Sequence, residues 1–367
     1  MLTKKEAARC EQVLRHLLYG EDTPLPPDTD WVRMGQIMAA HRMQSMTDCA
    51  QDPALRPLAH LANARAHAMY RHAAHETMKA LFAEASRRGI RMAVIKGVVL
   101  EDCYPPDLIR NSWDIDLYIP DDQREAFNRI MQEQGMTLTS DIYKSQQGVD
   151  VFCTPSGLKI EVHYIIFRMF SARQRRILRK RGYFSADCLM PCTAAGIDCV
   201  TMKPEAHLVY LLYHTIKHML HHGLRYRMLT DLTLFVNRWG DAIDWTDLRA
   251  LIRELRCIRP VNALMCYCMR HLGMREDCWR KEGPALEPLV RLSLTSARYY
   301  AWERFHVRLN WPFYRSECVH TEDGYRNRHT YCVARAFKRK HLLATFTVWR
   351  VLRAIWGMEI DKTGEIE

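Results

Sequence analysis

The sequence lacks the features that mark membrane, secreted and repeat proteins. No stretch reaches the roughly 18 uninterrupted apolar residues that a membrane-spanning helix requires. The first residues, MLTKKEAARCEQVL, form a charged amphipathic pattern without the apolar stretch and small-residue cleavage site of a secretory signal. Internal repeats and low-complexity segments are also missing. We therefore expect a cytoplasmic protein without a transmembrane segment.

Paired Cys-x2-Cys motifs, the mark of structural zinc sites, are missing as well. The 13 cysteines are odd in number and scattered, which is typical of a reducing compartment where thiols stay free. Cys188, Cys192 and Cys199 are spaced Cys-x3-Cys-x6-Cys, and Cys266 and Cys268 form Cys-x-Cys. We interpret all of them as ordinary buried thiols.

Positive charge is what the sequence has in excess. The 367 residues carry a formal net charge of +11, with a pI near 9.1. This balance favours anionic partners such as nucleotides, nucleic acid or a phospholipid surface. The length allows two or three domains, and 48% apolar residues are ample for folded cores.

Apolar periodicity divides the chain into helical parts and one mixed part. The 3.6-residue period of helices runs through the first segment and returns from about residue 200 onward, with strand-like runs between. We predict an α+β fold, in which a small mixed-sheet core is flanked by helical regions. The predicted units are an N-terminal helical region (1–88), an α/β core (89–168), a C-terminal helical domain (169–300) and a basic, aromatic-rich helical tail (301–367).

The predicted core alternates short strands with helices. RMAVIKG (91–97) and WDIDLYIP (113–120) have the composition of buried strands. DDQREAFNRIMQEQG (121–135) predicts a helix with Asp121 or Asp122 as its N-cap. The following pattern predicts a hairpin whose strands are joined by the turn TPSG (154–157).

Carboxylates interrupt two of these apolar strands. Asp114 and Asp116 stand two residues apart, so in a strand they share one face. Glu161 alternates with apolar residues in LKIEVHYII in the same way. Like charges repel when buried, and a divalent cation compensates them; oxygen ligands of this kind suit Mg²⁺ or Mn²⁺. Three such acids are able to hold the two metals of phosphoryl or nucleotidyl transfer.

A simpler interpretation of Asp-x-Asp is a half-exposed strand whose polar side faces water. Strand alternation alone produces that pattern. The glycine that closes the preceding strand, together with Glu161 on a later strand, favours the functional interpretation.

The order VIKG, a short helix, RNSWDIDLYI and later KIEVHY resembles the nucleotidyltransferase fold superfamily. More narrowly, its Lys-Gly, Asp-x-Asp and Glu-x-His pattern is similar to the bacterial family of uncharacterised nucleotidyltransferases. The resemblance is specific over about 91–166 and weaker over 205–235. It implies that Asp114 and Asp116 bind the catalytic metal, that Glu161 completes the site and that Gly97 lets the backbone approach the triphosphate.

One departure from the superfamily concerns the phosphates. Its members commonly carry Ser after the glycine, whereas Val98 follows here and has no hydroxyl group. Phosphate contacts are then expected from Lys96, from Arg110 or from backbone N–H groups at the next helix start. Lys96 has an alternative role as a solvated lysine at a strand end, and Arg110 as a structural ion pair with the acids. His163 is expected to assist or to orient Glu161.

A histidine-rich helical stretch lies downstream of the core. His214 and His218 share a face at i and i+4, while His221 and His222 follow. These histidines and Arg225 are expected to face the cleft and touch nucleotide or acceptor, or to pack. A second metal site with Asp231 is the alternative, although no Glu follows the first histidine as in zinc proteases.

Two basic segments have alternative interpretations. The run RMFSARQRRILRKRG (168–182) is either a solvated linker helix or a polyanion-binding one. The stretch HLLATFTVWRVLRAIWGM (341–358) is either a helix docked on the body or on a partner protomer, or one that lies on an anionic membrane.

We therefore predict a metal-dependent nucleotidyltransferase. It would use an NTP, with ATP as the expected one, and transfer the NMP to an acceptor with release of pyrophosphate. Small molecules, sugar phosphates, peptides, proteins and RNA all remain as acceptors. The alternatives are an inactive nucleotidyltransferase-like module that binds RNA or a partner protein, and a histidine-metal phosphohydrolase built on 214–231.

Overall fold

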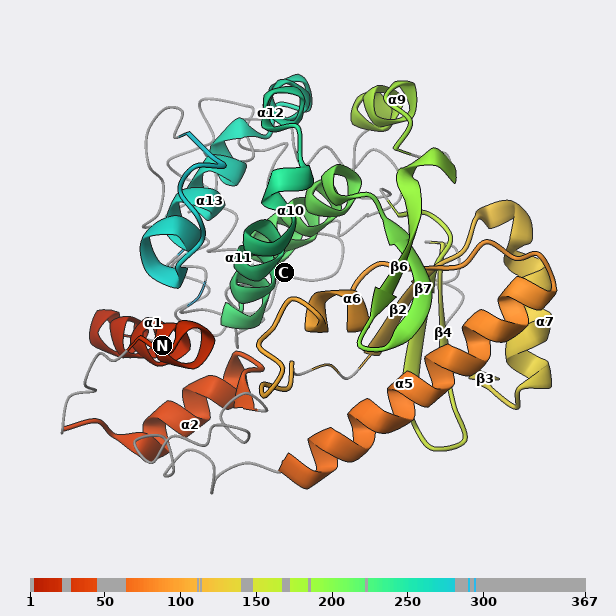
Figure 1. The fold of residues 1–367 in the computed structure, drawn as a ribbon, viewed down its shortest axis with the longest axis horizontal. Helices are drawn as coiled ribbons and strands as arrows, with labels where there is room; N and C mark the ends of the chain where they lie inside the picture. Colours follow the sequence, from red (N-terminus) through yellow and green to blue (C-terminus); the bar gives the residue numbers. More distant parts are fainter. Residues whose placement is uncertain are drawn as a thin grey trace, which may run out of the picture.

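Helices precede and follow a seven-stranded mixed sheet (Figure 1). The computed structural model describes residues 3–21, 28–44, 64–110, 112, 114–139, 148–166, 172–183, 186–221, 224–280, 290 and 294. The α+β class predicted from the sequence is confirmed. The predicted tail (301–367), with its segment 341–358, lies outside the described residues.

At the centre of the sheet β2 lies beside β5, although the two strands are not consecutive in the sequence. Its strand order is β3-β4-β5-β2-β1-β7-β6. β2 runs parallel to β5 and β1 parallel to β7, whereas the other neighbours are antiparallel. The strands are β1 (Ala93–Val94), β2 (Asp114–Tyr118), β3 (Thr137–Leu138), β4 (Val149–Cys153), β5 (Lys159–His163), β6 (Leu189–Ala194) and β7 (Ile197–Met202).

The predicted hairpin is β4 and β5. The backbone N–H of Gly157 donates to the carbonyl of Thr154 at 2.9 Å, which closes the turn that the sequence indicates. A second hairpin, β6 and β7, was not predicted; it lies within the range assigned to the C-terminal helical domain, ahead of the helices expected from about residue 200. Its turn residues Ala195 and Gly196 both have positive φ, at 49° and 72°. The turn signal was missed because alanine, unlike asparagine or glycine, rarely adopts such a conformation.

This second hairpin brings two thiols together. Cys192 and Cys199 are paired across β6 and β7, with 3.3 Å between their Sγ atoms. Cys199 is buried, as are Cys188, Cys266 and Cys268, whereas Cys192 is half-buried. The expectation of buried thiols therefore holds for four of these five positions.

Helices cover the sheet and form a body of their own. The helices are α1 (Lys4–Tyr19), α2 (Trp31–Ala40), α5 (Ala64–Arg87), α6 (Val98–Glu101), α7 (Arg124–Glu133), α9 (Ala172–Lys180), α10 (Pro204–His221), α11 (Tyr226–Trp239), α12 (Trp245–Glu254) and α13 (Ile258–Leu272). α5 and α7 pack on one face of the sheet, where Ile115 and Leu117 of β2 join Phe127 and Ile130 of α7 in one core (Figure 1). A second core lies among α1, α2, α10, α11 and α13.

The start of α7 differs from the sequence prediction. Asp121 and Asp122 form a 3₁₀ turn rather than an N-cap, and Gln123 precedes α7 without a capping hydrogen bond from its side chain. The Gln123 side chain instead accepts from the Arg91 backbone N–H at 2.8 Å. A tertiary contact with the segment before β1 has therefore replaced local capping. The helix ends before Gly135, as predicted, where φ is 72°.

No helix among the described residues combines the length and the apolar composition needed to cross a membrane.

Candidate active site

Strand β2 gives Asp114 and Asp116 a common face. Ile115 and Leu117 alternate with them and lie in the core beneath α5 and α7. Burial of these two apolar side chains holds the strand in place and turns both carboxylates to the opposite face. Asp116 is only 2% exposed, whereas Asp114 is half-buried.

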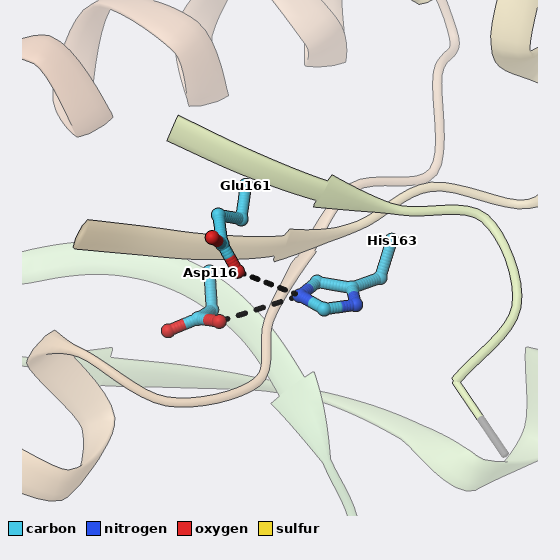
Figure 2. A group of neighbouring side chains, drawn as sticks. All are labelled: Asp116, Glu161 and His163. Atoms are coloured by element: carbon cyan, nitrogen blue, oxygen red, sulfur yellow. Dashed lines mark hydrogen bonds and ion pairs between the residues drawn. The ribbon is translucent and has the colours of Figure 1, made fainter. Parts of the chain in front are cut away.

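The parallel pairing of β2 with β5 brings the third acid to Asp116. In this register Asp116 stands directly beside Glu161, and Tyr118 beside His163. Nε2 of His163 lies 3.3 Å from Oδ1 of Asp116 and 4.0 Å from Oε2 of Glu161 (Figure 2). One ligand atom from each of Asp116, Glu161 and His163 lies within 4.8 Å of the other two. Two strands far apart in the sequence thus build one small polar group.

Lys96 compensates the buried charge of Asp116. Its Nζ lies 2.6 Å from Oδ1 of Asp116, and its side chain is 14% exposed. Burial alone would raise the pKa of Asp116, but the charge of Lys96 and the hydrogen bond from His163 hold that pKa well below its usual range. Burial would likewise lower the pKa of Lys96, but Asp116 keeps it above its ordinary value. Both groups are therefore charged at neutral pH.

Asp114 lies outside this close group and lines a neighbouring pocket. The pocket encloses about 470 Å³, including space open to solvent, and Gly97, Val98 and Arg110 also line it. Gly97 has φ 61° and ψ −121°, a conformation that only glycine adopts readily. The glycine predicted for phosphate approach and the outer aspartate thus share one cavity. α6, which follows Gly97, is only 4 residues long.

Helix α5 supplies a pocket wall that the sequence analysis did not assign to the site. Tyr70, Arg71 and His75 line it, together with Glu101 of α6. Arg71 forms an ion pair with Glu101, and Nε2 of His75 lies 3.3 Å from Oε2 of the same residue. Burial and then the charge of Asp114 raise the pKa of Tyr70. Arg71 and His75 stand four residues apart and, with His67, form a polar stripe along one face of the helix, which is a signal that could have identified the wall from sequence.

Arg110 is held by Asp231 rather than by Asp114 and Asp116. Its Nε and Nη2 donate to Oδ1 and Oδ2 of Asp231 at 2.6 and 2.8 Å, and the Tyr104 hydroxyl donates to Oδ1 at 2.8 Å. Burial opposes the charge of Asp231, but Arg110 keeps its pKa below the ordinary value. Asp231, the residue considered for a second metal site, is therefore occupied by an arginine and a tyrosine.

The rings of the histidines of α10 lie against one another at a tilt of 56°. The rings of His214 and His218 lie 4.7 Å apart between centroids, and Tyr210 stacks on His214 at 5.9 Å. Tyr210 is buried, and burial raises the pKa of its hydroxyl; the charge of Lys96 opposes this shift, and the carboxylates add to it. The side chains of His221 and His222 lie outside what the structure describes.

Tyr210 therefore links α10 to the acidic group, whereas the two histidines stand one and two turns farther along the helix. The link was missed because Tyr210 belongs to the apolar run LVYLLY, which from sequence predicts only core packing.

Arg225 immediately precedes α11 and is half-buried. Burial, with the positive charges of Arg42 and Arg227, lowers the pKa of Arg225 to about 10, and Asp114 opposes this shift. That Arg225 faces the cleft and touches nucleotide or acceptor stays a prediction.

The donor groups fit a divalent cation. Two carboxylates and an imidazole meet within 4.8 Å, and Asp114 follows on the same face. Mg²⁺ prefers the carboxylate oxygens, and Mn²⁺ also accepts the imidazole nitrogen. Among the described residues no other group of His, Cys, Asp and Glu meets the same closeness.

The basic run is partly structural. Arg181, which follows α9, forms ion pairs with Asp247 and Glu254 of α12 at 2.6 and 3.1 Å. Arg176, Arg179 and Lys180 are exposed on α9, whereas Arg168 lies outside the described part of the chain. Both interpretations of the exposed face stay predictions.

Comparison with known proteins gives one family and a distant structural likeness. The sequence family described as "Uncharacterised nucleotidyltransferase" matches residues 27–273. No curated protein matches the sequence. Among solved structures, an antigenic nucleotidyltransferase-like protein from Paracoccidioides brasiliensis is similar at 14% identity and a TM-score of 0.33, over 55% of this chain and 92% of that one. A likeness this weak says nothing about activity.

Proposed function

The chain belongs to the uncharacterised nucleotidyltransferase family, and from this premise we propose that it is a metal-dependent nucleotidyltransferase. In this proposal it transfers the NMP part of an NTP, with ATP as the expected nucleotide, to an acceptor and releases pyrophosphate. Small molecules, sugar phosphates, peptides, proteins and RNA are all compatible acceptors.

One observation carries the proposal: Asp116 and Glu161 stand side by side in the parallel pair of β2 and β5, with Asp114 on the same face. Placing like charges together is unfavourable unless cations compensate them. Lys96 balances the charge of Asp116, but Asp114 and Glu161 add two further negative charges, which favours a ligand of opposite charge. Asp114, Asp116 and Glu161 are the residues that would hold Mg²⁺ or Mn²⁺, with His163 beside them. When bound, such a metal neutralises phosphate charge and stabilises the leaving pyrophosphate.

The chain's own groups suggest a division of labour. Glu161 is 30% exposed, so an approaching acceptor hydroxyl is able to reach it. In the proposed step the acceptor oxygen gives its proton to the Glu161 carboxylate and bonds to the α-phosphorus, while the bond from that phosphorus to pyrophosphate breaks. Oδ1 of Asp116 already lies against Lys96 and His163. Asp116 is therefore proposed to stay negatively charged and not to take the proton.

The pocket beside Asp114 suits the nucleotide. Gly97 exposes backbone without a Cβ, and no atom lies within 4 Å of the place where a Cβ would stand. The triphosphate is therefore able to approach the chain there. The pocket's other wall, on α5, is available to the rest of the nucleotide or to the acceptor.

The proposal is tested with Asp116→Asn and Glu161→Gln. Each is expected to lower NTP-dependent pyrophosphate release at least roughly a hundredfold, because each removes a charge needed in the transition state. The assay uses each labelled NTP with a cell extract from which the labelled acceptor is then identified.

Asp150→Asn is the matched control. Asp150 is equally buried and pairs with Arg124 at 2.9 Å, but it lies on the opposite face of the sheet, in register with Val162. This variant is expected to keep its turnover. Full activity in both site variants would refute the proposal.

The contact between Lys96 and Asp116 favours a second candidate, an inactive module that binds RNA or a partner protein. A lysine ammonium already compensates the buried acid, and Val98 supplies no hydroxyl group. Titration with Mg²⁺ and NTP separates the two candidates. NTP binding without pyrophosphate release, together with RNA affinity that falls steeply with salt, identifies the module.

A further inference from the structure

Two cysteines lie opposite each other in the hairpin of β6 and β7. Cys192 and Cys199 are direct partners in its antiparallel register, and their Sγ atoms lie 3.3 Å apart. Directly opposite residues of an antiparallel pair have Cα atoms about 4.5–5.5 Å apart. A disulfide requires a Cα separation of about 4.4–6.8 Å. The backbone therefore already has the spacing of a disulfide, and only the two side chains have to turn.

Other contacts hold the hairpin in this register. In the next pair along the strands, Oγ1 of Thr193 donates to Oδ1 of Asp198 at 2.7 Å. In the turn, the backbone N–H of Ala195 donates to Oδ1 of Asp102 at 3.2 Å. Asp102 directly follows α6, the short helix that begins after Gly97. The two thiols are thus kept opposite each other by the hairpin itself and by a contact with α6.

The two thiols differ in burial. Cys199 is 6% exposed and lies in the core beneath α5, together with Ala194 and Ile197. Cys192 is half-buried and packs against the same core from β6, which is the last strand in the sheet order. A small oxidant therefore reaches Cys192 first, with the second sulfur atom directly beside it.

The contact between the thiols also makes Cys192 the more reactive one. The hydrogen bond with Cys199 lowers the pKa of Cys192, while burial and the charge of Asp102 oppose this shift. The same hydrogen bond, together with burial, raises the pKa of Cys199. The thiolate is the form that attacks an oxidant. An accessible, more acidic thiol beside a second thiol is typical of reversible redox cysteines.

The Cys-x-Cys pair of α13 is arranged differently. Cys266 and Cys268 are buried, and residues two positions apart on a helix do not face each other. The Cys266 thiol donates to Oδ1 of Asn262 at 3.6 Å, and the Cys268 thiol donates to the carbonyl of Leu229 at 3.7 Å. These two thiols fit the expectation of ordinary buried cysteines, whereas the hairpin pair has the geometry for a bond.

We propose that Cys192 and Cys199 form an oxidative modification site, which hydrogen peroxide converts into a reversible disulfide. The Cys192 thiolate attacks one peroxide oxygen, the O–O bond breaks, and the released hydroxide takes the proton that Cys192 has lost and leaves as water. Sγ of Cys199 then attacks Sγ of the resulting sulfenic acid. The S–O bond breaks, and the hydroxyl group leaves as water with the Cys199 proton. The two thiols lose two electrons in total, and one peroxide becomes two water molecules.

The proposal agrees with free thiols in the resting protein. In a reducing compartment, disulfides are usually transient and serve catalysis or redox sensing. A small thiol reductant returns the pair to the reduced state by thiol–disulfide exchange.

Peptide mapping of the folded, full-length protein tests the site. The reduced protein is treated with one equivalent of hydrogen peroxide, its remaining thiols are alkylated, and the chain is cleaved before aspartate. Cleavage before Asp198 separates Cys192 from Cys199, so a disulfide between them joins two peptides. This linked pair is expected to be the main product and to separate again with dithiothreitol. Cys192 and Cys199 should lose their alkylation at least about tenfold faster than the half-buried Cys153.

Cys188→Ser is the matched control. Cleavage before Asp187 leaves Cys188 on the same peptide as Cys192, but Cys188 is buried and precedes β6. This variant is expected to keep the linked pair, whereas Cys192→Ala and Cys199→Ala are expected to lose it. A link from Cys188 to Cys199 in equal yield in Cys192→Ala would overturn the inference, because the hairpin register would then not select the pair. If an alanine variant does not fold, the map of the wild-type protein decides.

The same treatment of the chemically unfolded protein separates folded geometry from closeness in the sequence. With 13 cysteines in the chain, the links are expected to spread over several pairs once the hairpin is lost. An equal share of the link between Cys192 and Cys199 in folded and unfolded protein contradicts the proposal. So does oxidation of Cys153 in the folded protein while both hairpin thiols remain alkylated. Neither nucleotide nor metal enters the experiment, so its result does not depend on the proposed function.

Discussion

Lys96 and Asp116 form a buried ion pair in which Nζ lies 2.6 Å from Oδ1. The same oxygen lies 3.3 Å from Nε2 of His163. An ammonium therefore supplies the compensation that a cation bound by Asp116 and Glu161 would also supply. Lysine and metal are expected to compete for one carboxylate, which makes the pair a sensitive test of the site.

Replacement of this lysine is expected to destabilise the protein and to increase the effect of metal. Lys96→Met leaves Asp116 buried and less compensated, at a cost of about 3–5 kcal/mol in the free energy of unfolding. Added Mn²⁺ should then raise the melting temperature of the variant more than that of the wild type, because the metal replaces the lost charge. Thermal unfolding with and without Mn²⁺ measures both effects.

Lys79→Met is the control, since the ion pair of Lys79 with Glu76 is exposed. An equal response of Lys96→Met and wild type to Mn²⁺ would show that no metal binds beside Asp116.

Gly97→Ala tests the backbone at the pocket. The added methyl group meets no atom within 4 Å, so its cost comes from φ 61° rather than from a clash, and about 1–3 kcal/mol is expected. Gly196→Ala is matched, with φ 72° and equally open space, but it lies in the turn between β6 and β7. Nucleotide affinity should fall in the first variant alone. An equal fall in both would mean that strain, not phosphate approach, is responsible.

Asp231→Asn distinguishes the structural from the ligand-binding role of Arg110. The variant leaves the Arg110 guanidinium, which is 3% exposed, without its carboxylate. Its free energy of unfolding, measured by chemical denaturation, is expected to fall by about 3–5 kcal/mol. Asp247→Asn, which weakens an exposed pair with Arg181, should cost less than about 1 kcal/mol. If the free energy of unfolding falls by the same small amount in both variants, the ion pair with Asp231 is not what holds Arg110 in place.

The pH dependence of stability should carry a contribution from His207. Burial lowers its pKa to about 4 from an ordinary 6.5, and its Nε2 lies 2.9 Å from the carbonyl oxygen of Ile95. The unfolded chain therefore binds this proton first as pH falls. Stability from neutral His207 is complete above pH 6.5 and is lost toward pH 4, by at most about 1.4 kcal/mol per pH unit.

His207→Gln keeps an N–H donor and should reduce the loss of stability between pH 6.5 and pH 4. Denaturation at several pH values measures the slope, with the exposed His72→Gln as control. A wild-type slope in His207→Gln would assign the pH dependence to other groups.

Some features of the site followed from local pattern. The alternation Asp-Ile-Asp-Leu-Tyr predicted one acidic and one apolar face of β2, and the turn at 154–157 predicted the hairpin that presents Glu161. Hairpin β6 and β7 was missed because Ala195 is an unusual turn residue. The predicted N-cap of α7 was wrong because Asp121 and Asp122 form a 3₁₀ turn before the helix, and Gln123, which precedes α7, accepts from the Arg91 backbone instead.

The sequence by itself determined that Asp114 and Asp116 share a face, because side chains alternate along any strand. It also determined the α+β class, since helical and strand periods differ. Only the tertiary structure decided that Asp116 meets Glu161 and Lys96, and that Arg110 turns to Asp231. Those partners depend on strand register and helix packing, which join distant positions and leave no trace in local spacing.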